Sequence, residues 1–421
     1  MHLLLIHQNF PGQFRDLAPA WLKAGHRITA LGSSEPPPDD AQWHGLQYIR
    51  YGFDSDLTWL DRGTAVAAIC RQLLDHDERP DLVLCHSAWG EALKLTTACA
   101  GVPWISYPEL WGTAEALGFG FDHALDGLEP NQDSFSSQNL MTELALLQSD
   151  AAVVASRSQW LSFPEPLRKR LSLQMEGVDL ERIRPDRGAQ FCSPDHGLTL
   201  KAGQPIVTFI SRDMEPLRGL RQLLRAWPGV SQAVPTAQLL LVGGEGRGYG
   251  LEAAQHCNHL EDGLDAMPIG VDRSRIHRLG HLNHQEMLQL LQCSACHVAL
   301  SYPYTLSWSV LEAMACGAPL ISNHGSPIAT ELGSSASNTI KLIPFNSVSA
   351  LEHAIVALLQ QPLKQRKLGD AAREWVSRHA SLSQALQGYE ALFSQLRVES
   401  VTQARGDCPQ PKSQAPPDVS R

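Results

Sequence analysis

The sequence predicts an α/β protein with two parallel-sheet domains, and three observations support this fold class. The chain has 421 residues, more than one hydrophobic core usually serves. Short apolar runs alternate with helical stretches, a pattern typical of parallel sheets covered on both faces. The alternation breaks once, around residues 183–204, where prolines and glycines accumulate, and then restarts. We therefore expect two Rossmann-like domains facing a central cleft.

The first domain is expected to span residues 1–190. Its apolar runs predict strands at residues 2–6, 26–31, 46–51, 81–85, 103–106 and 150–154. Helical stretches between these strands are expected at residues 13–24, 61–79 and 89–100. Ligands of open α/β sheets bind beyond the carboxyl ends of the strands, so the loops there are the places to look for chemistry.

The second domain is expected at residues 200–380, after an interdomain linker at 183–204. Strands are predicted at residues 205–210, 237–242, 275–280, 296–300, 318–322 and 339–343, with a helix at 217–227. Amphipathic helices fill residues 347–397, and the last of them, at 381–397, is expected to return to the first domain. Residues 398–421 are polar and rich in proline, which predicts a disordered tail.

Composition excludes some classes of protein. The net charge of -10 argues against a nucleic-acid-binding surface. An odd number of cysteines, 9, fits reduced thiols, and the first residues lack the features of a signal peptide, so we expect a cytoplasmic protein. The basic run Arg168-Lys169-Arg170 suggests weak peripheral contact with an anionic inner-membrane surface, or simply a solvated helix face.

Two local patterns suggest metals or haem and have simpler explanations. Cys293-Ser-Ala-Cys296-His297 matches the string that attaches c-type haem, but it also reads as a helix end followed by an apolar strand. The cluster His277, His281 and His284 has no carboxylate or cysteine at a fitting spacing. We therefore expect neither a metal nor a bound cofactor.

The most informative stretch is residues 299–320, ALSYPYTLSWSVLEAMACGAPL. A strand runs through a loop into a helix, and the free N–H groups of such a helix start favour phosphate. Thr305, Leu306 and Ser307 would present these donors, and the carboxylate of Glu312 could accept hydrogen bonds from two ribose hydroxyls. Alternatively, Ser309 and Glu312 have the spacing of a capping box, in which the glutamate only satisfies the helix start.

Two arginines follow the first strand of the second domain, in residues 209–220, FISRDMEPLRGL. Arg212 and Arg218 lie at a strand–helix loop, where guanidinium groups suit the paired oxygens of a diphosphate. The alternative is a pair of surface arginines bonded to Asp213 and Glu215.

The first domain offers further candidates at the ends of its strands. In residues 7–14, HQNFPGQF, Gly12 permits close approach of a ligand, or marks an ordinary turn. His86 and Glu109 follow two other strands, where each could position an acceptor hydroxyl or act on its proton, or form only a loop hydrogen bond. In the second domain, Gly244 of the glycine-rich loop 243–250 is a further candidate for the donor site, although the loop matches no dinucleotide fingerprint.

Taken together, these motifs resemble glycosyltransferase family 4, enzymes of the GT-B fold that are mostly retaining. The resemblance extends to about residue 397. It rests on these segments in order: LLLIHQNFPGQF at the start, DLVLCH at 81–86, EGVD at 176–179, Arg212, Arg218-Gly219 and LEAMACGAP at 311–319.

The resemblance implies that Glu312 holds the donor ribose and that Arg212 and Arg218 neutralise the diphosphate. It further implies that residues 305–307 touch the same phosphates and that Gly12 faces them from the other domain. The expected activity is transfer of a sugar from a nucleoside diphosphate sugar, as co-substrate, to a glycan, lipid-linked or small-molecule acceptor. Such a transfer would need no metal.

Two positions depart from the family pattern. The family has two glutamates separated by seven residues; here Tyr304 stands where the first would be, in a subgroup that shares this change. Arg218 stands where lysine is usual. Tyr304 also supports a rival interpretation, a non-catalytic sugar-nucleotide-binding subunit. A second rival is another GT-B enzyme, such as an epimerase or a phosphorylase.

Overall fold

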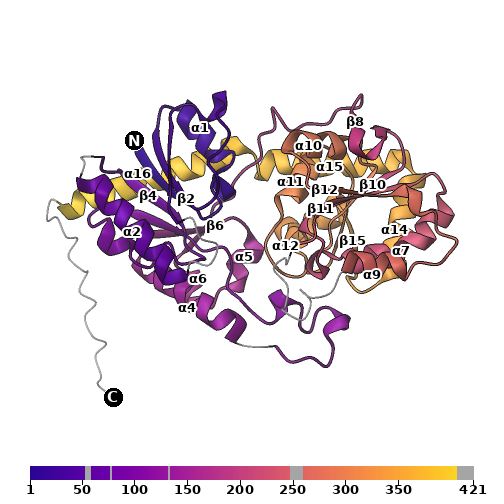
Figure 1. Ribbon diagram of the computed structural model, residues 1–421, viewed down its shortest axis with the longest axis horizontal. Helices are drawn as coiled ribbons and strands as arrows, with labels where there is room; N and C mark the ends of the chain where they lie inside the picture. Colours follow the sequence, from indigo (N-terminus) through magenta and orange to yellow (C-terminus); the bar gives the residue numbers. More distant parts are fainter. Residues whose placement is uncertain (53–57, 76–77, 131–132, 247–258, 405–421) are drawn as a thin grey trace, which may run out of the picture.

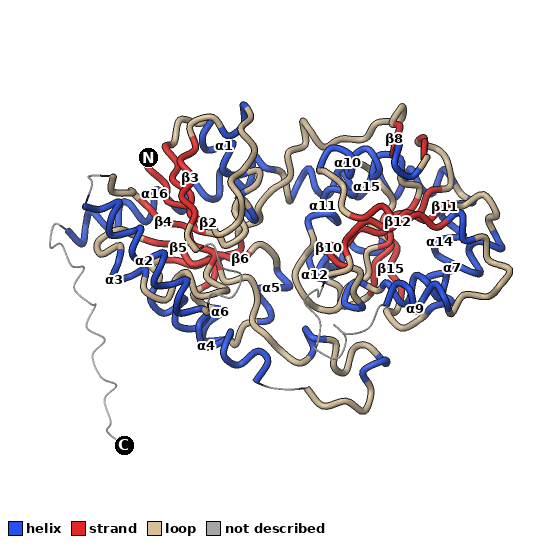
Figure 2. The backbone as a smooth tube through the Cα atoms, viewed as in Figure 1, coloured by secondary structure: helices blue, strands red, loops and turns tan. Residues whose placement is uncertain are grey.

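The computed structural model describes residues 1–52, 58–75, 78–130, 133–246 and 259–404. It has two lobes, each built around a twisted parallel sheet with helices on both sides (Figure 1 and Figure 2). Apolar strand residues are almost completely buried in both lobes. The prediction of two parallel-sheet α/β domains is confirmed.

The first sheet has seven parallel strands in the order β3-β2-β1-β4-β5-β6-β7. The strands are β1 (His2–Ile6), β2 (Arg27–Gly32), β3 (Leu46–Arg50), β4 (Leu82–His86), β5 (Trp104–Tyr107), β6 (Ala151–Val154) and β7 (Leu171–Leu173). The helices are α1 (Leu17–Lys23), α2 (Trp59–Asp75), α3 (Leu95–Ala98), α4 (Asp133–Gln148), α5 (Arg157–Ser162) and α6 (Glu165–Arg168). The six predicted strands of this half all form, and β7 is an additional strand.

The second sheet has six parallel strands in the order β12-β11-β10-β13-β14-β15. The strands are β10 (Ile206–Asp213), β11 (Gln238–Gly244), β12 (Ile276–Gly280), β13 (Cys296–Val298), β14 (Leu320–Asn323) and β15 (Lys341–Ile343). The helices that cover it are α7 (Leu220–Ala233), α9 (His259–Asp265), α10 (His284–Cys293), α11 (Trp308–Ala315), α12 (Pro327–Leu332), α13 (Ala336–Thr339), α14 (Val348–Gln360) and α15 (Pro362–His379).

The segment expected to be a linker, 183–204, is instead partly folded onto the second domain. It contains the antiparallel hairpin of β8 (Gln190–Ser193) and β9 (Leu198–Lys201). Phe191 and Leu200 are buried against Ile206 and Leu240 of the second sheet. The prolines and glycines therefore mark turns around a hairpin, and apolar residues at alternate positions were the overlooked signal.

The helix after β4 is also shorter than predicted, since α3 covers only Leu95–Ala98 of the expected 89–100. At the end of the chain, α16 (Leu382–Ala404) extends past residue 397, so the predicted tail begins later than 398. Residues 405–421, on which the rest of that prediction falls, lie outside the described residues.

The C-terminal helix α16 crosses from the second domain to the first, as Figure 1 shows. Tyr389 and Phe393 pack against Trp21 of α1, each with ring centroids 5.5 Å from it. The crossing runs beside the earlier one, because the Val178 N–H donates to Ala380 and the Leu382 N–H donates to Val178. Two adjacent chain segments therefore connect the domains.

A third connection is a long excursion between β5 and α4, residues 113–130, which we call the strap. It leaves the first sheet and packs on the second domain. Asp122 accepts hydrogen bonds from Arg221 (2.5 Å) and Tyr302 (2.6 Å). Phe121 contacts the rings of Tyr302 and Phe345, with centroids 5.9 and 5.2 Å away.

Candidate active site

Glu312 lies on α11, which begins at Trp308 after Ser307 as the N-cap. The helix therefore starts before Ser309, and Ser309 bonds to Ser307 rather than capping the helix. The carboxylate of Glu312 bonds to side chains from elsewhere in the fold, Arg15 and His284. The capping-box alternative for Glu312 is thus wrong, because the glutamate does not serve the start of its own helix.

The turn before α11 and Arg218 line one pocket in the second domain. Thr305, Leu306 and Ser307 form part of its wall, together with residues of β10, of the segment after β13 and of the start of α12. Arg218 donates to the Ser301 hydroxyl (3.0 Å) and to the Thr305 carbonyl (3.2 Å). Of the predicted phosphate-binding groups, Arg218 and residues 305–307 therefore meet at the carboxyl edge of the sheet, where a guanidinium and a helix start can act on one anion, whereas Arg212 does not line this pocket.

Arg212 is the last but one residue of β10, and 55% of its side chain is exposed. Its Nε donates to Asp213 at 3.1 Å, which is the ion pair of the alternative interpretation. Charge from Arg212 nevertheless acts on Glu109 of the first domain, together with charge from Arg218. Both arginines thus lower the pKa of the same carboxylate of the first domain.

Glu109 and His86 come together where β5 and β4 of the first sheet end. The Glu109 Oε2 lies 3.8 Å from the His86 Nε2. Burial and the charge of Glu176 raise the pKa of Glu109 to about 7, although Arg218 and Arg212 partly offset the effect. Burial and the neighbouring His7 hold the pKa of His86 well below its usual value. At neutral pH, His86 is therefore uncharged and Glu109 can exchange a proton.

Position 12 requires a glycine for structural reasons. Its φ is +45°, and a Cβ there would lie 2.3 Å from the ring of His7. His7 is buried, accepts from the Asn9 N–H at 3.0 Å, and donates to Gln13. Gly12 starts the short 3-10 helix Gly12–Phe14, which delivers Arg15 towards the second domain.

Gly244 ends β11, and a Cβ there would lie 2.5 Å from the ring of His281. The rest of the glycine-rich loop, from residue 247, lies outside the described residues. Tyr304, where the family has its first glutamate, is half-buried and packs against the core of the second domain. Its carbonyl accepts a hydrogen bond from Ser158 of the first domain at 3.4 Å.

Several interdomain contacts were not anticipated from the sequence. Arg15 Nη2 donates to Glu312 Oε1 at 2.7 Å, and the guanidinium lies 5.0 Å from the centroid of the Trp308 ring. The indole of Trp308 donates to Glu176, which also accepts from Tyr107 at 2.5 Å. Arg15 directly follows the motif at residues 7–14, and Glu176 is the first residue of the motif at 176–179. These positions beside motifs are the sequence features that could have pointed to the two residues.

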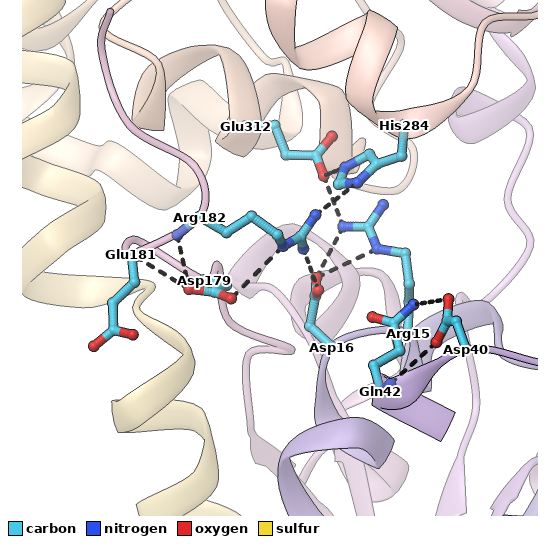
Figure 3. A network of polar contacts seen from close by, with 9 residues as sticks. All are labelled: Arg15, Asp16, Asp40, Gln42, Asp179, Glu181, Arg182, His284 and Glu312. Carbon is cyan, nitrogen blue, oxygen red and sulfur yellow. Dashed lines mark hydrogen bonds and ion pairs between the residues drawn. The ribbon is translucent and has the colours of Figure 1, made fainter. Parts of the chain in front are cut away.

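Arg15, Asp16, Arg182, His284 and Glu312 form what we call the interdomain polar network (Figure 3). Arg182 donates to Asp16 (2.5 Å) and to His284 Nδ1 (2.7 Å). His284 Nε2 then donates to Glu312 at 2.7 Å. Since Nδ1 accepts from a guanidinium, these bonds assign the Nε2–H tautomer to His284. Burial alone would raise the pKa of Glu312, but His284 and Arg15 outweigh it, so the pKa lies below its usual value.

The patterns that suggested metal or haem have structural roles. Cys293 is buried at the end of α10, and Cys296 and His297 are buried in β13. His277 bonds to Gln238 at 2.7 Å. Within the described residues, no group of three or more His, Cys, Asp or Glu side chains could hold a metal ion.

The basic run at 168–170 makes internal contacts. Arg168 bonds to the Phe163 carbonyl and stacks on Trp160, Lys169 pairs with Glu165, and Arg170 bonds to the Leu146 carbonyl. In the part of the chain that the structure describes, no helix has both the length and the apolar character needed to cross a bilayer.

Two protein-family models match this chain, one in each domain. The family described as "Glycosyl transferase family 4 group" matches residues 25–183, and "Glycosyl transferases group 1" matches residues 204–361. The chain belongs to the family 4 glycosyltransferases. The two matches correspond to the two domains in order, so the resemblance seen in the motifs is confirmed.

One curated relative is a GDP-mannose-dependent monoacylated alpha-(1-6)-phosphatidylinositol monomannoside mannosyltransferase of Corynebacterium glutamicum. It is 27% identical over 209 residues, which are 48% of this chain and 50% of the relative. This chain thus matches about half the length of that protein.

Solved structures of similar fold include sucrose-phosphate synthase from Thermosynechococcus elongatus, with a TM-score of 0.73 and 19% identity. That match covers 95% of this chain and all of the other. Anabaena HepE in complex with UDP-glucose has a TM-score of 0.67 and 16% identity, covering 94% of this chain and 100% of HepE. At these identities the likeness establishes the GT-B fold.

Proposed function

We propose that this chain transfers a sugar from a nucleoside diphosphate sugar to an acceptor hydroxyl, with retention and without a metal ion. The observation that carries the proposal is the pocket shared by Arg218 and the start of α11, residues 305–307. These groups are fixed before any ligand arrives, so they can stabilise the charge that develops on a leaving diphosphate. The GDP-mannose-dependent relative and the UDP-glucose complex of a similar fold support this class of donor.

The residues take distinct roles in this proposal. Glu312 holds the donor ribose, while Arg212, Arg218 and the N–H groups of residues 305–307 hold the diphosphate. Glu109 lies where an acceptor hydroxyl would come from the first domain. Its pKa of about 7, raised by burial and by Glu176, suits a group that accepts a proton near neutral pH. His86, kept neutral by burial, orients the acceptor beside it. Closure of the two domains excludes water from the donor.

The acceptor is a glycan, a lipid-linked glycan or a small metabolite, and the residue roles given above apply to each of these acceptors. A cytoplasmic location, with weak contact to the inner membrane face, would suit a lipid-linked acceptor. Arg168 and Arg170 keep their charge, but their bonds to backbone carbonyls leave the two side chains less free to reach an anionic membrane than the sequence alone suggested.

Nucleotide binding tests the donor site directly. Thermal unfolding is measured with millimolar UDP, GDP, ADP and dTDP, on the wild type and on Glu312→Ala. A nucleotide at about 100 times its Kd should add about 2.7 kcal/mol, which raises Tm by several degrees. We expect a rise with one base in the wild type and its loss in Glu312→Ala. Glu374→Ala, at an exposed helical pair with Arg378, is the control and should respond as the wild type does.

Absence of any shift in the wild type would contradict the donor site. Tyr304 supports a second candidate function, a subunit that binds a sugar nucleotide without turning it over. Release of free nucleoside diphosphate from UDP-glucose and GDP-mannose distinguishes the two. Nucleotide binding without any release, across a panel of acceptors, would favour the binding subunit.

A further inference from the structure

The interdomain polar network occupies the carboxylate that the proposed function assigns to the donor ribose. Glu312 is only 2% exposed, and its Oε1 already accepts from Arg15 Nη2 and from His284 Nε2, each at 2.7 Å. A ribose needs the same carboxylate to accept from its two neighbouring hydroxyls. In the conformation described, the chain itself therefore takes both acceptor positions of Oε1 and leaves the ribose only Oε2 (Figure 3).

The two donors on Glu312 differ in origin. His284 begins α10 and Glu312 lies on α11, so both belong to the second domain and keep their geometry when the domains move. Arg15 follows the Gly12–Phe14 turn of the first domain. Its bond to Glu312 therefore depends on how the two domains sit, and it is the donor that a ribose can replace.

The surroundings of Arg15 allow it to leave. Asp16 accepts from Arg15 at 2.9 Å, so the guanidinium keeps a counter-ion of its own domain after it releases Glu312. The side chain of Arg15 is 28% exposed, against 2% for Glu312, so it withdraws towards solvent rather than through the core. The ribose would then replace a charged donor by neutral hydroxyls, and His284 would stay as the second donor.

We infer that Arg15 is a gate on the donor site, which closes the Glu312 carboxylate in the empty protein and must give way to the ribose. This inference rests on the proposed nucleotide-sugar function. Beyond that function, Arg15 lowers the affinity of the site for its donor. The replacement of Arg15 by ribose on Glu312 also requires the two domains to separate. The two states compete, since a ribose that donates to both carboxylate oxygens needs the acceptor position on Oε1 that Arg15 holds.

Titration calorimetry with UDP, GDP, ADP and dTDP tests the gate. In the wild type, the ribose of the nucleotide can donate to both oxygens of Glu312 only if the charge-assisted hydrogen bond between Arg15 and Glu312 breaks. Arg15→Ala lacks this bond, so it should bind its preferred nucleotide about tenfold more tightly. Arg15→Gln, which keeps much of the side chain without the charge, should tighten binding in the same direction. Circular dichroism of both variants checks that they fold.

Arg50→Ala is the matched control. Arg50 has similar side-chain exposure, 30%, and pairs with Glu35 within the first domain. Its removal should leave nucleotide affinity unchanged, whereas a tenfold change would attribute the Arg15 effect to lost surface charge and overturn the gate.

A second probe isolates the ribose. The 2′,3′-dideoxy form of the preferred nucleotide cannot donate to Glu312, so Arg15→Ala should tighten its binding by less than about twofold. Equal tightening of both forms would mean a general loosening of the domains and would overturn the gate. Weaker or unchanged binding of the normal nucleotide by Arg15→Ala would overturn it too, while leaving the proposed donor site intact. If neither the wild type nor Arg15→Ala binds any nucleotide, both proposals fail together.

Discussion

The strap and the interdomain polar network both join the two domains, but by different kinds of contact. On the strap, Asp122 is 1% exposed and is bonded to Arg221 and Tyr302, beside the aromatic rings of Phe121 and Phe345. In the network, Arg15 and Arg182 keep 28% and 40% of their side chains exposed. Arg221 of the strap is 23% exposed, close to Arg15, so the difference lies in the buried Tyr302 hydroxyl and the aromatic packing beside Asp122 and in the more exposed Arg182–Asp16 pair of the network. Buried contacts are costly to break and exposed pairs are cheap, so the strap suits a fixed attachment and the network suits an exchangeable one.

The two kinds of contact allow the domains to separate on one side only. An opening that separates Arg15 from Glu312 need not detach the strap, because the strap packs on α7 and on the segments after β13 and β15 instead of on α11. The strap therefore offers a pivot around which the donor side can open.

The largest expected effect is at Asp122 of the strap. Asp122→Ala leaves the Tyr302 hydroxyl and the Arg221 guanidinium without their buried acceptor, and should lower the free energy of unfolding by about 3 kcal/mol. Urea denaturation followed by tryptophan fluorescence measures it. Asp126→Ala, at an exposed strap position, should change stability by less than about 0.5 kcal/mol. Equal effects of the two changes would remove the distinction between a fixed and an exchangeable contact.

A smaller effect is expected at two glycines of the strap. Gly118 and Gly120 both have positive φ, +97° and +70°, so alanine is strained at either position. A Cβ at Gly118 would also lie 2.4 Å from the Tyr302 ring, whereas one at Gly120 meets nothing within 4 Å. Gly118→Ala should therefore be less stable than Gly120→Ala by about 1–2 kcal/mol in thermal unfolding. Identical melting curves would mean that the strap does not pack tightly on Tyr302.

The smallest effect is expected in the network, for the pair of Arg182 and Asp16. A double-mutant cycle of Arg182→Ala and Asp16→Ala, measured by urea denaturation, should give a coupling of about 0.5 kcal/mol, because Arg182 is well exposed. A coupling above about 2 kcal/mol would show that the network is as firmly fixed as the strap, and would count against an exchangeable contact.

Much of the candidate site could be located from the sequence because its residues follow strands. Glu312, Arg218 and residues 305–307 lie in one βα unit or its neighbour, so strand periodicity places them at the same sheet edge. Glu109 and His86 follow adjacent strands, β5 and β4, for the same reason. Their roles in donor and acceptor binding stay predictions.

The partners of these residues could not be predicted in the same way. Arg15 and Glu312 are 297 positions apart, and no local pattern says that they meet. His284 was weighed only as a metal ligand, because its neighbours in the sequence are other histidines, whereas its neighbours in space are Arg182 and Glu312. The hairpin β8–β9 was taken for a linker since its few apolar residues are buried only against another part of the chain.

The sequence by itself determined the two sheets, their parallel strands and the loops that carry the candidate residues, because strand periodicity and turn chemistry are local properties. The tertiary structure alone decided which of those loops face each other. It put the strap against Tyr302 and Arg15 against Glu312, contacts that depend on how two separately folded sheets dock. Burial and neighbouring charge then set the ionisation of Glu109 and Glu312, and part of that charge, from Arg218 and Arg212 on Glu109 and from Arg15 on Glu312, acts only once the domains have come together.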